Sequence, residues 1–330
     1  MNNVYLASVG TRSGKSLLSI GLAMNYPGKV GFYKPFRENT VNKNGQLMDQ
    51  DAVLLAEVLK LEGSEKLSPY MYDLFNPVSL KDIVSSYDEL RKDKEFMIIE
   101  GSRDFANGCS HGISHIDIAE ALDAPMVLVS SPSFQSLDSI FMFKYLCDER
   151  KIDLKGVVIN KSTGPKEKEF LEKKGIPVIG EIPLIPELRT FRVYEITERM
   201  ELNVIAGRAG MDNSVEEVLV GAMSPQVAVR YMRRSKKKAV ITGGDRTEIL
   251  LAALSTNTSC IIVTGGVMPI RTVMSRADEL KIPILLTNED TLTAAEAIDH
   301  LIARIDPKDT EKIDLMRKAI RKDVDLTKIW

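Results

Sequence analysis

A run of small and basic residues near the N-terminus has the composition of a loop that holds a phosphate group. It reads Val9-Gly10-Thr11-Arg12-Ser13-Gly14-Lys15-Ser16 and stands between an apolar stretch and an amphipathic one. Backbone N–H groups of such a loop point toward an anion at the start of a helix, and the helix dipole favours the negative charge. The ammonium of Lys15 would neutralise the β- and γ-phosphates of a nucleotide, and the hydroxyl of Ser16 could bind Mg²⁺. We therefore predict phosphate binding by residues 10–16.

The spacing of this loop is a variant of the usual pattern. The pattern places a glycine five positions before the glycine of the Gly-Lys pair, and Val9 stands there, with Gly10 as the early glycine instead. A glycine-rich turn that opens a helix and binds nothing is the alternative interpretation. We favour phosphate binding because the preceding strand, the loop, the Gly14-Lys15-Ser16 step and the following helix all agree.

Charged residues that end two further apolar runs could complete a nucleotide site. Glu100 follows four apolar residues at the end of a predicted strand, which is where ligands bind in open α/β sheets. An acidic residue there could hold Mg²⁺, directly or through water. Lys34 ends another such run and could add a second cation for phosphates or for an acidic substrate. A solvated glutamate and a surface lysine before a turn are the alternatives.

The elements that must position these residues alternate between short apolar runs and amphipathic segments. Strands are predicted at Val4–Ser8, Val30–Lys34, Phe96–Glu100, Met126–Ser130, Gly156–Asn160 and Val178–Ile182. Helices are predicted at Ser16–Met24, Asp51–Lys60, Leu80–Arg91, Leu137–Asp148 and Lys166–Lys174. Because the strands are apolar on successive residues, both faces of their sheet must be covered. The fold class is therefore α/β, a parallel sheet with helices on both faces.

A second, smaller α/β series follows residue 190. Its predicted strands are Val218–Ala222, Ala239–Thr242, Cys260–Thr264 and Ile284–Thr287, each followed by a helix. Two of these strands end in Thr-Gly-Gly, at Thr242 and Thr264, and this spacing of 22 residues indicates an internal βα repeat. We predict a first domain over 1–190, a second over 191–305, and a helical tail over 306–330 that docks on the body. A tail that binds a partner is the alternative.

Composition and charge argue against several classes of protein. The formal net charge of −2 gives no general attraction to nucleic acid or to an anionic membrane surface. No apolar run approaches the roughly 18 residues that a membrane helix needs, and the N-terminus has no pattern of a secretion signal. Three scattered cysteines fit reduced thiols, so we expect a cytoplasmic protein. Cys109, His111 and His115 lack the further ligand of a metal site, and His115 is expected at the start of a helix.

Several short motifs occur together over residues 1–190. They are Gly14-Lys15-Ser16, Tyr33-Lys34-Pro35, Asp51-Ala52, Ile99-Glu100-Gly101 and Val158-Ile159-Asn160-Lys161. Their order resembles that of dethiobiotin synthetase and the related cobyrinic acid amidases. The resemblance implies that Lys15 contacts phosphate, that Ser16, Asp51 and Glu100 surround Mg²⁺, and that Asn160 reaches the purine of ATP. It also implies that Lys34 lies near a substrate.

The second half adds a further resemblance. Gly243-Gly244-Asp245-Arg246-Thr247, together with Thr264-Gly265-Gly266, resembles the DRTGG domain. The pairing of the two domains resembles the N-terminal half of long bacterial phosphate acetyltransferases, in which a further C-terminal domain carries acetyl transfer. This resemblance implies a regulatory half that stands alone and is not itself an acetyltransferase. It also implies a homo-oligomer formed through the second domain, since DRTGG domains resemble modules that pair with themselves.

Three hypotheses follow for the function. The first is a regulatory or interaction protein, related to phosphotransacetylase, that binds ATP with Mg²⁺ and responds to the nucleotide. The second is an ATP-dependent carboxylate ligase of the dethiobiotin synthetase type, with Lys15 and Lys34 as catalytic residues; Phe36-Arg37-Glu38 replaces the small polar residues that the synthetase uses, which argues against its substrate. The third is a scaffold that has lost the nucleotide, for which Val9 is the argument. Whether the chain is an enzyme stays open.

Overall fold

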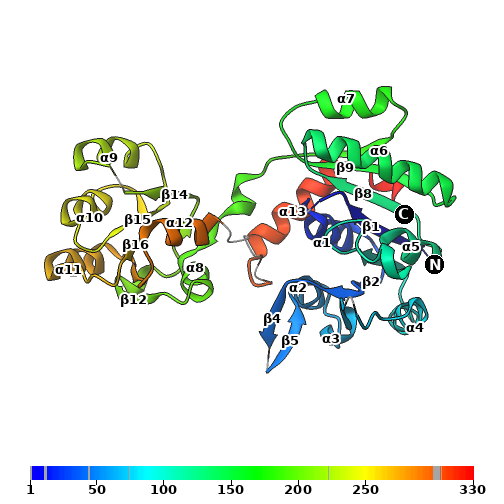
Figure 1. Cartoon of the computed structure of the whole chain (residues 1–330), viewed down its shortest axis with the longest axis horizontal. Helices are drawn as coiled ribbons and strands as arrows, with labels where there is room; N and C mark the ends of the chain where they lie inside the picture. The colour runs from blue at the N-terminus through cyan, green and yellow to red at the C-terminus, as the bar shows by residue number, and fades with distance from the viewer. Residues whose placement is uncertain are drawn as a thin grey trace. The chain divides into compact units, whose positions relative to one another are not determined.

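The chain divides into two compact units. The structure is a computed structural model that describes residues 2–10, 13–43, 45–73, 75–221, 223–299, 305 and 307–330. Unit 1 consists of Met1–Leu184 together with Ile305–Trp330, and unit 2 consists of Ile185–Arg304 (Figure 1). Unit 2 is therefore an insertion in the chain of unit 1.

Unit 1 is built on a six-stranded sheet in the order β10-β9-β8-β1-β7-β2, and every pairing in it is parallel. The strands are β1 Asn2–Ser8, β2 Val30–Tyr33, β7 Phe96–Glu100, β8 Met126–Ser130, β9 Leu154–Ser162 and β10 Val178–Pro183. Side chains on both faces of β2, β7 and β8 are buried, which explains their apolar runs. The predicted parallel sheet is confirmed.

Helices cover both faces of this sheet. They are α1 Lys15–Asn25, α2 Gln50–Leu59, α3 Ser64–Leu67, α4 Leu80–Leu90, α5 His115–Ala121, α6 Phe134–Glu149, α7 Lys166–Lys173 and α13 Thr310–Asp323. One apolar core joins the sheet to α4, α5, α6 and α7. On the other face α1 contacts β1 and β7, and α2 contacts β2. The fold therefore places the loop before α1 at the carboxyl ends of the strands.

The C-terminal segment packs against α1, the helix that follows the loop after β1. Helix α13 lies beside α1 (Figure 1). Ile320 fills the space over Gly21, where a Cβ atom would lie 2.1 Å from the Ile320 Cγ1 atom. Val324 forms an antiparallel bridge to Gly180 of β10, and the Trp330 ring packs edge-on against Tyr26. These contacts make residues 307–330 part of unit 1.

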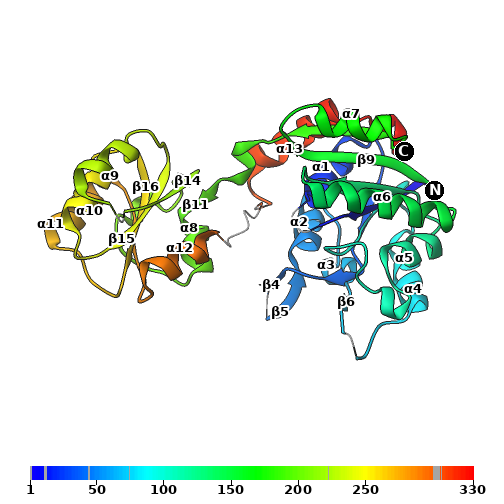
Figure 2. The same cartoon turned by 45° about the horizontal axis from the view of Figure 1, so that its top comes forward.

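Unit 2 contains a five-stranded sheet in the order β12-β17-β16-β15-β14. Its strands are β12 Asn203–Ala206, β14 Glu217–Val220, β15 Lys238–Gly243, β16 Thr258–Thr264 and β17 Ile284–Leu286. Its helices are α8 Val193–Arg199, α9 Pro225–Met232, α10 Thr247–Leu254, α11 Arg271–Leu280 and α12 Thr291–Asp299. Helices α9, α10 and α11 cover one face of the sheet, and α8 and α12 cover the other (Figure 2). A second, smaller α/β fold is confirmed.

Several elements differ from the prediction. Strand β12 pairs antiparallel with β17 and was not predicted, since it has only four residues and is partly exposed. The hairpin of β4 Thr40–Lys43 and β5 Gln46–Asp49 was also missed, because much of it faces solvent. Among the described residues, no helix is long and apolar enough to cross a membrane.

Candidate functional site

The loop between β1 and α1 leads into a helix whose N-terminus has no side-chain cap. Gly14 is the N-cap of α1 and has φ 102°, in the left-handed region that glycine tolerates. Helix α1 has no side-chain cap and no acidic residue in its first turn. Because first-turn N–H groups have no partner within a helix, this terminus suits an external anion. Gly10 and Ser13 flank the centre of the loop, and the predicted residues Thr11 and Arg12 lie outside the described residues.

Lys15 is buried at the carboxyl end of β1. Its Nζ atom donates to the Oγ atom of Ser8 at 2.8 Å, and this hydroxyl donates to the carbonyl of Arg103 at 2.9 Å. Burial lowers the pKa of Lys15, and the Glu100 carboxylate acts in the opposite direction. Ser8, which the sequence did not single out, therefore fixes the position of the ammonium.

Glu100 is buried, not solvated, at the end of the adjacent strand β7. Its Oε2 atom accepts from Ser19 Oγ at 2.7 Å, and its Oε1 atom lies 3.4 Å from Ser16 Oγ. Burial, reinforced by the negative charge of Asp51, raises the pKa of Glu100 to about 7, although Lys34 and Lys15 oppose the rise. The first turn and a half of α1 therefore holds this carboxyl group through two hydroxyls.

Asp51 reaches the same place from helix α2. The side chain of Asp49 caps this helix by accepting from the backbone N–H groups of Asp51 and Ala52 at 2.9 and 3.1 Å. Burial alone would raise the pKa of Asp51, but the Lys34 charge and hydrogen bonds from Lys34 and Ser16 hold it below its usual range. The fold thus brings Ser16, Asp51 and Glu100 together.

Lys34, immediately after β2, lies in the middle of these carboxylates. Only 1% of its surface is exposed, so the surface-lysine alternative is wrong. Its Nζ atom lies 2.6 Å from Asp51 Oδ2 and 3.1 Å from Asp49 Oδ2, with Glu38 Oε2 and Glu100 Oε1 each at 3.9 Å. Burial alone would lower the pKa of Lys34, but the surrounding carboxylates raise it above its usual value. The side chain is therefore a charged ammonium inside the protein.

Asn160, in β9, contacts the loop that precedes α1. Its Nδ2 atom donates to the Ser13 carbonyl at 2.8 Å, and its Oδ1 atom accepts from the Lys161 N–H at 3.0 Å. A Cβ atom on Gly14 would lie 2.0 Å from Asn160 Nδ2, so only glycine fits there. Asn160 is thus placed against the loop, next to Gly14.

His115 is a buried neighbour of the candidate site, and its partner there is Ser102. As expected it begins a helix, α5, but its Nε2 atom also lies 3.0 Å from Ser102 Oγ. The ring packs on Gly101, where a Cβ atom would lie 2.6 Å from the His115 Cε1 atom. Burial, with a smaller contribution from Lys15, lowers the pKa of His115 to about 3, so the ring is neutral. Gly101 and Ser102, the small residues after Glu100, are the feature of the sequence that could have indicated a packed ring at this position.

The chemistry of the donor set fits Mg²⁺. Ser16, Asp51 and Glu100 offer a hydroxyl and two carboxylates, and Mg²⁺ prefers such oxygen ligands. In the described part of the chain, no group of three or more His, Cys, Asp or Glu side chains is arranged to hold a metal. The predicted set differs from such a group because one of its members is a serine and because Lys34 pairs with its carboxylates.

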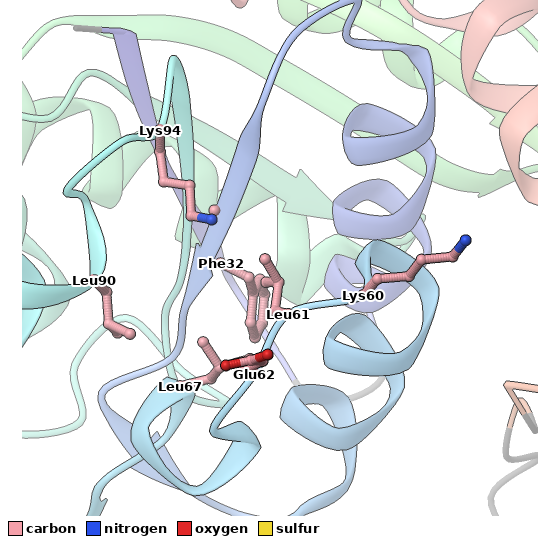
Figure 3. Close-up of a pocket in the computed structure, with 8 residues that line it drawn as sticks. Phe32, Lys60, Leu61, Glu62, Leu67, Leu90 and Lys94 are labelled. Carbon is pink, nitrogen blue, oxygen red and sulfur yellow. The ribbon is translucent and has the colours of Figure 1, made fainter.

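A cavity of about 380 Å³ opens elsewhere in unit 1 and contains none of the predicted site residues. Figure 3 labels the lining side chains of Phe32, Lys60, Leu61, Glu62, Leu67, Leu90 and Lys94. The Lys60 ammonium points away from the apolar side chains, and its charge therefore does not converge with that of Lys94 (Figure 3). The charged cluster around Lys34, and not this cavity, is the candidate site.

Known proteins share both halves of this chain. The phosphate acetyltransferase of Synechocystis sp. is 25% identical over 344 residues, covering 94% of this chain and 49% of that protein. The ATP-dependent dethiobiotin synthetase BioD of Bacillus velezensis is 22% identical over 220 residues, covering 60% of this chain and 94% of the synthetase. The chain therefore spans about half the length of the phosphate acetyltransferase that it matches.

The crystal structure of a ParA family ATPase from Chlorobium tepidum TLS is also similar, with 16% identity and a TM-score of 0.39 over 57% of this chain and 86% of that chain. This TM-score is too low to bear on function. The model of the DRTGG domain matches residues 195–301. The model AAA_26, described as an AAA domain, matches residues 2–192, which is more than half of the 330 residues. The chain therefore belongs to the AAA_26 family, with a P-loop nucleotide-binding domain followed by a DRTGG domain.

Proposed function

We propose that this chain is a regulatory protein that binds ATP with Mg²⁺ in unit 1 and responds to it through unit 2. The observation that carries the proposal is the convergence of Lys15, Ser16, Asp51 and Glu100 where the adjacent strands β1 and β7 end. An uncapped helix N-terminus and a buried ammonium supply positive potential for phosphates. A hydroxyl and two carboxylates supply ligands for the accompanying cation.

Each residue has a distinct part in this proposal. Lys15 and the backbone of residues 10–16 bind the phosphate groups. Ser16, Asp51 and Glu100 hold Mg²⁺, whose charge would offset that of the phosphate oxygens. Asn160, next to the loop, contacts the purine. The proposal extends to Thr11 and Arg12 as members of the loop.

The regulatory part of the proposal is supported by the relationship to phosphate acetyltransferases. Alignments with two of them cover 94% and 99% of this chain but about half of each enzyme. The shared part consists of the P-loop domain and the DRTGG domain. We propose that this chain acts by binding a nucleotide, that it assembles with itself through unit 2, and that it works in the cytoplasm.

A carboxylate ligase is the second candidate. It is supported by the match to almost the full length of an enzyme named ATP-dependent dethiobiotin synthetase. Against it stands the environment of Lys34, since four carboxylates surround the ammonium that would meet an acidic substrate. For the ligase, ADP would be released only when such a substrate is added.

Calorimetry with ATP, ADP and GTP, each with and without Mg²⁺, tests the proposal. We expect Mg²⁺-dependent binding of ATP by the wild type and a loss of about 10- to 100-fold in affinity for Lys15→Ala, because charge-assisted contacts to phosphate disappear. Lys144→Ala is the matched control, since Lys144 is paired with Asp148 on the exposed surface of α6 in the same unit. Unchanged ATP affinity in a folded Lys15→Ala would refute the site, and substrate-dependent ADP release would favour the ligase.

A further inference from the structure

Lys34 is a cation enclosed by carboxylates that serve two different purposes. Asp51 and Glu100 belong to the proposed Mg²⁺ ligands. Asp49 and Glu38 do not, and each is held by a backbone contact of its own. Asp49 Oδ1 caps helix α2 at 2.9 Å from the Asp51 N–H, and Glu38 Oε1 accepts from the Arg103 N–H at 2.7 Å. The other oxygen of each, Asp49 Oδ2 and Glu38 Oε2, lies 3.1 and 3.9 Å from the ammonium, and Asp49 Oδ2 also accepts from the Glu38 N–H at 3.0 Å.

We propose that Lys34 is a built-in counter-cation that competes with Mg²⁺ for Asp51 and Glu100. This inference rests on the proposed function, because it takes Ser16, Asp51 and Glu100 as the metal ligands. In the described structure the ammonium lies 2.6 Å from Asp51 and thus occupies the surroundings that a metal ion would need. Its positive charge both satisfies the carboxylates and repels a second cation.

The arrangement allows Lys34 to give up two partners without becoming an unpaired buried charge. An isolated buried ammonium would be strongly unfavourable. Asp49 Oδ2 at 3.1 Å and Glu38 Oε2 at 3.9 Å remain as partners when the other pair is engaged elsewhere. Lys34 therefore has carboxylate partners in two states. All four carboxylates contact it when no metal ion is bound, and Asp49 and Glu38 remain when Asp51 and Glu100 bind the metal.

The balance of charge explains why such a lysine is useful. Two ammoniums, of Lys15 and Lys34, face four carboxylates in this buried region, and the side chain of Lys34 is 1% exposed. Without Lys34, only the Lys15 ammonium would offset the repulsion between Asp51 and Glu100, and the pair would attract a divalent ion whether or not a nucleotide is present. With Lys34 in place, tight binding of Mg²⁺ depends on the added negative charge of nucleotide phosphates.

The test is the affinity of the nucleotide-free protein for Mn²⁺, a spectroscopic probe that also accepts oxygen ligands, measured by electron paramagnetic resonance. We expect Lys34→Met to bind Mn²⁺ at least about tenfold more tightly than the wild type, because a competing positive charge is gone. Lys34→Arg, which keeps the charge, should bind Mn²⁺ weakly, like the wild type. Lys43→Met is the matched control, since it removes an exposed lysine paired with Glu57.

The gain must disappear in the double variant Lys34→Met with Asp51→Asn if the metal binds where we propose. Equal Mn²⁺ affinity in Lys34→Met and the wild type overturns the competition, while Mg²⁺-dependent ATP binding by the wild type still upholds the proposed function. If Lys34→Met gains no Mn²⁺ affinity and the wild type also fails to bind ATP with Mg²⁺, both the competition and the proposed function are overturned. If Lys34→Met does not fold alone, competition predicts that Mg²⁺ restores its cooperative thermal unfolding, and failure at saturating Mg²⁺ contradicts it.

Discussion

The carboxyl ends of the strands look different in the two units, although both are α/β folds. In unit 1 this edge gathers buried charges: Lys15, Lys34 and Glu100 all lie within it. In unit 2 the corresponding strands β15 and β16 end in glycine-rich turns, and Gly265 and Gly266 both have positive φ. The same architecture therefore carries a cluster of buried ammoniums and carboxylates in one unit and glycine-rich turns in the other.

Arg246 is a cation at the carboxyl end of β15 in unit 2, and it binds main-chain carbonyls. The guanidinium of Arg246 donates to the carbonyl of Gly221 and, at 2.8 Å, to that of Met223. It ties β14 to the start of α10 and is already engaged with the main chain. In the segment between β16 and α11, Val267, Met268 and Ile270 are exposed apolar side chains. The comparison indicates that the carboxyl end of a parallel strand can carry a functional site in either unit. Whether it does depends on the charged side chains that the surrounding elements bring there.

The largest effect we expect is a loss of stability in unit 2 that leaves the ATP affinity of unit 1 unchanged. Ile261→Ala removes a fully buried side chain in the core of unit 2 and should destabilise that unit by about 2–5 kcal/mol. Differential scanning calorimetry should show an earlier unfolding transition for unit 2. The ATP affinity of unit 1, measured below that transition, should stay within about twofold of the wild type. A parallel loss of ATP affinity would break the comparison.

A smaller effect is expected for the arginine of unit 2. Arg246→Ala removes donors for two main-chain carbonyls and should lower the stability of unit 2 by about 1–3 kcal/mol. Chemical denaturation with a fluorescence probe in unit 2 would measure this change. Arg276→Ala, on the surface of α11, is the control and should change the stability by less than about 0.5 kcal/mol. Wild-type stability in Arg246→Ala would show that the contacts to Gly221 and Met223 carry no weight.

The mildest effect concerns the pH dependence of unit 1. The pKa of His115 is about 3 in the folded protein and 6.5 without the fold, so between these values the unfolded state binds more protons. Stability from this residue is therefore full above pH 6.5 and declines as the pH falls toward 3. His115→Gln removes the titration, and its melting temperature should fall less steeply between about pH 7 and pH 5. Identical slopes in the two proteins would contradict the assignment of a buried neutral histidine.

Much of the fold could be predicted because its strands are apolar runs. Phe96–Glu100 and Met126–Ser130 were predicted with their observed bounds, since both faces of each strand are buried. The hairpin Thr40–Lys43 with Gln46–Asp49 could not be predicted in the same way. Its first strand is half exposed and polar, so no apolar period marks it.

The candidate site could be predicted only where a motif carries it. Lys15, Ser16 and Glu100 follow from a loop and a strand end, and Asp51 came from the resemblance to a family. Ser19 was missed, since it meets Glu100 across 81 residues of sequence. Asp49 and Glu38 were missed for the same reason: the packing of α2 and the turn after β2 brings them to Lys34, and no local spacing encodes that meeting.

Hydrogen exchange of the wild type, with and without Mg²⁺ and ATP, tests most directly whether the nucleotide binds at the charged edge of unit 1. We predict slower exchange at the start of α1, because phosphates would engage the first-turn N–H groups of this helix, and in the residues that follow β7, because Glu100 would hold the accompanying Mg²⁺. The turns after β15 and β16 should exchange at unchanged rates or change less. Protection confined to those turns of unit 2, with none around Lys15, would contradict the account.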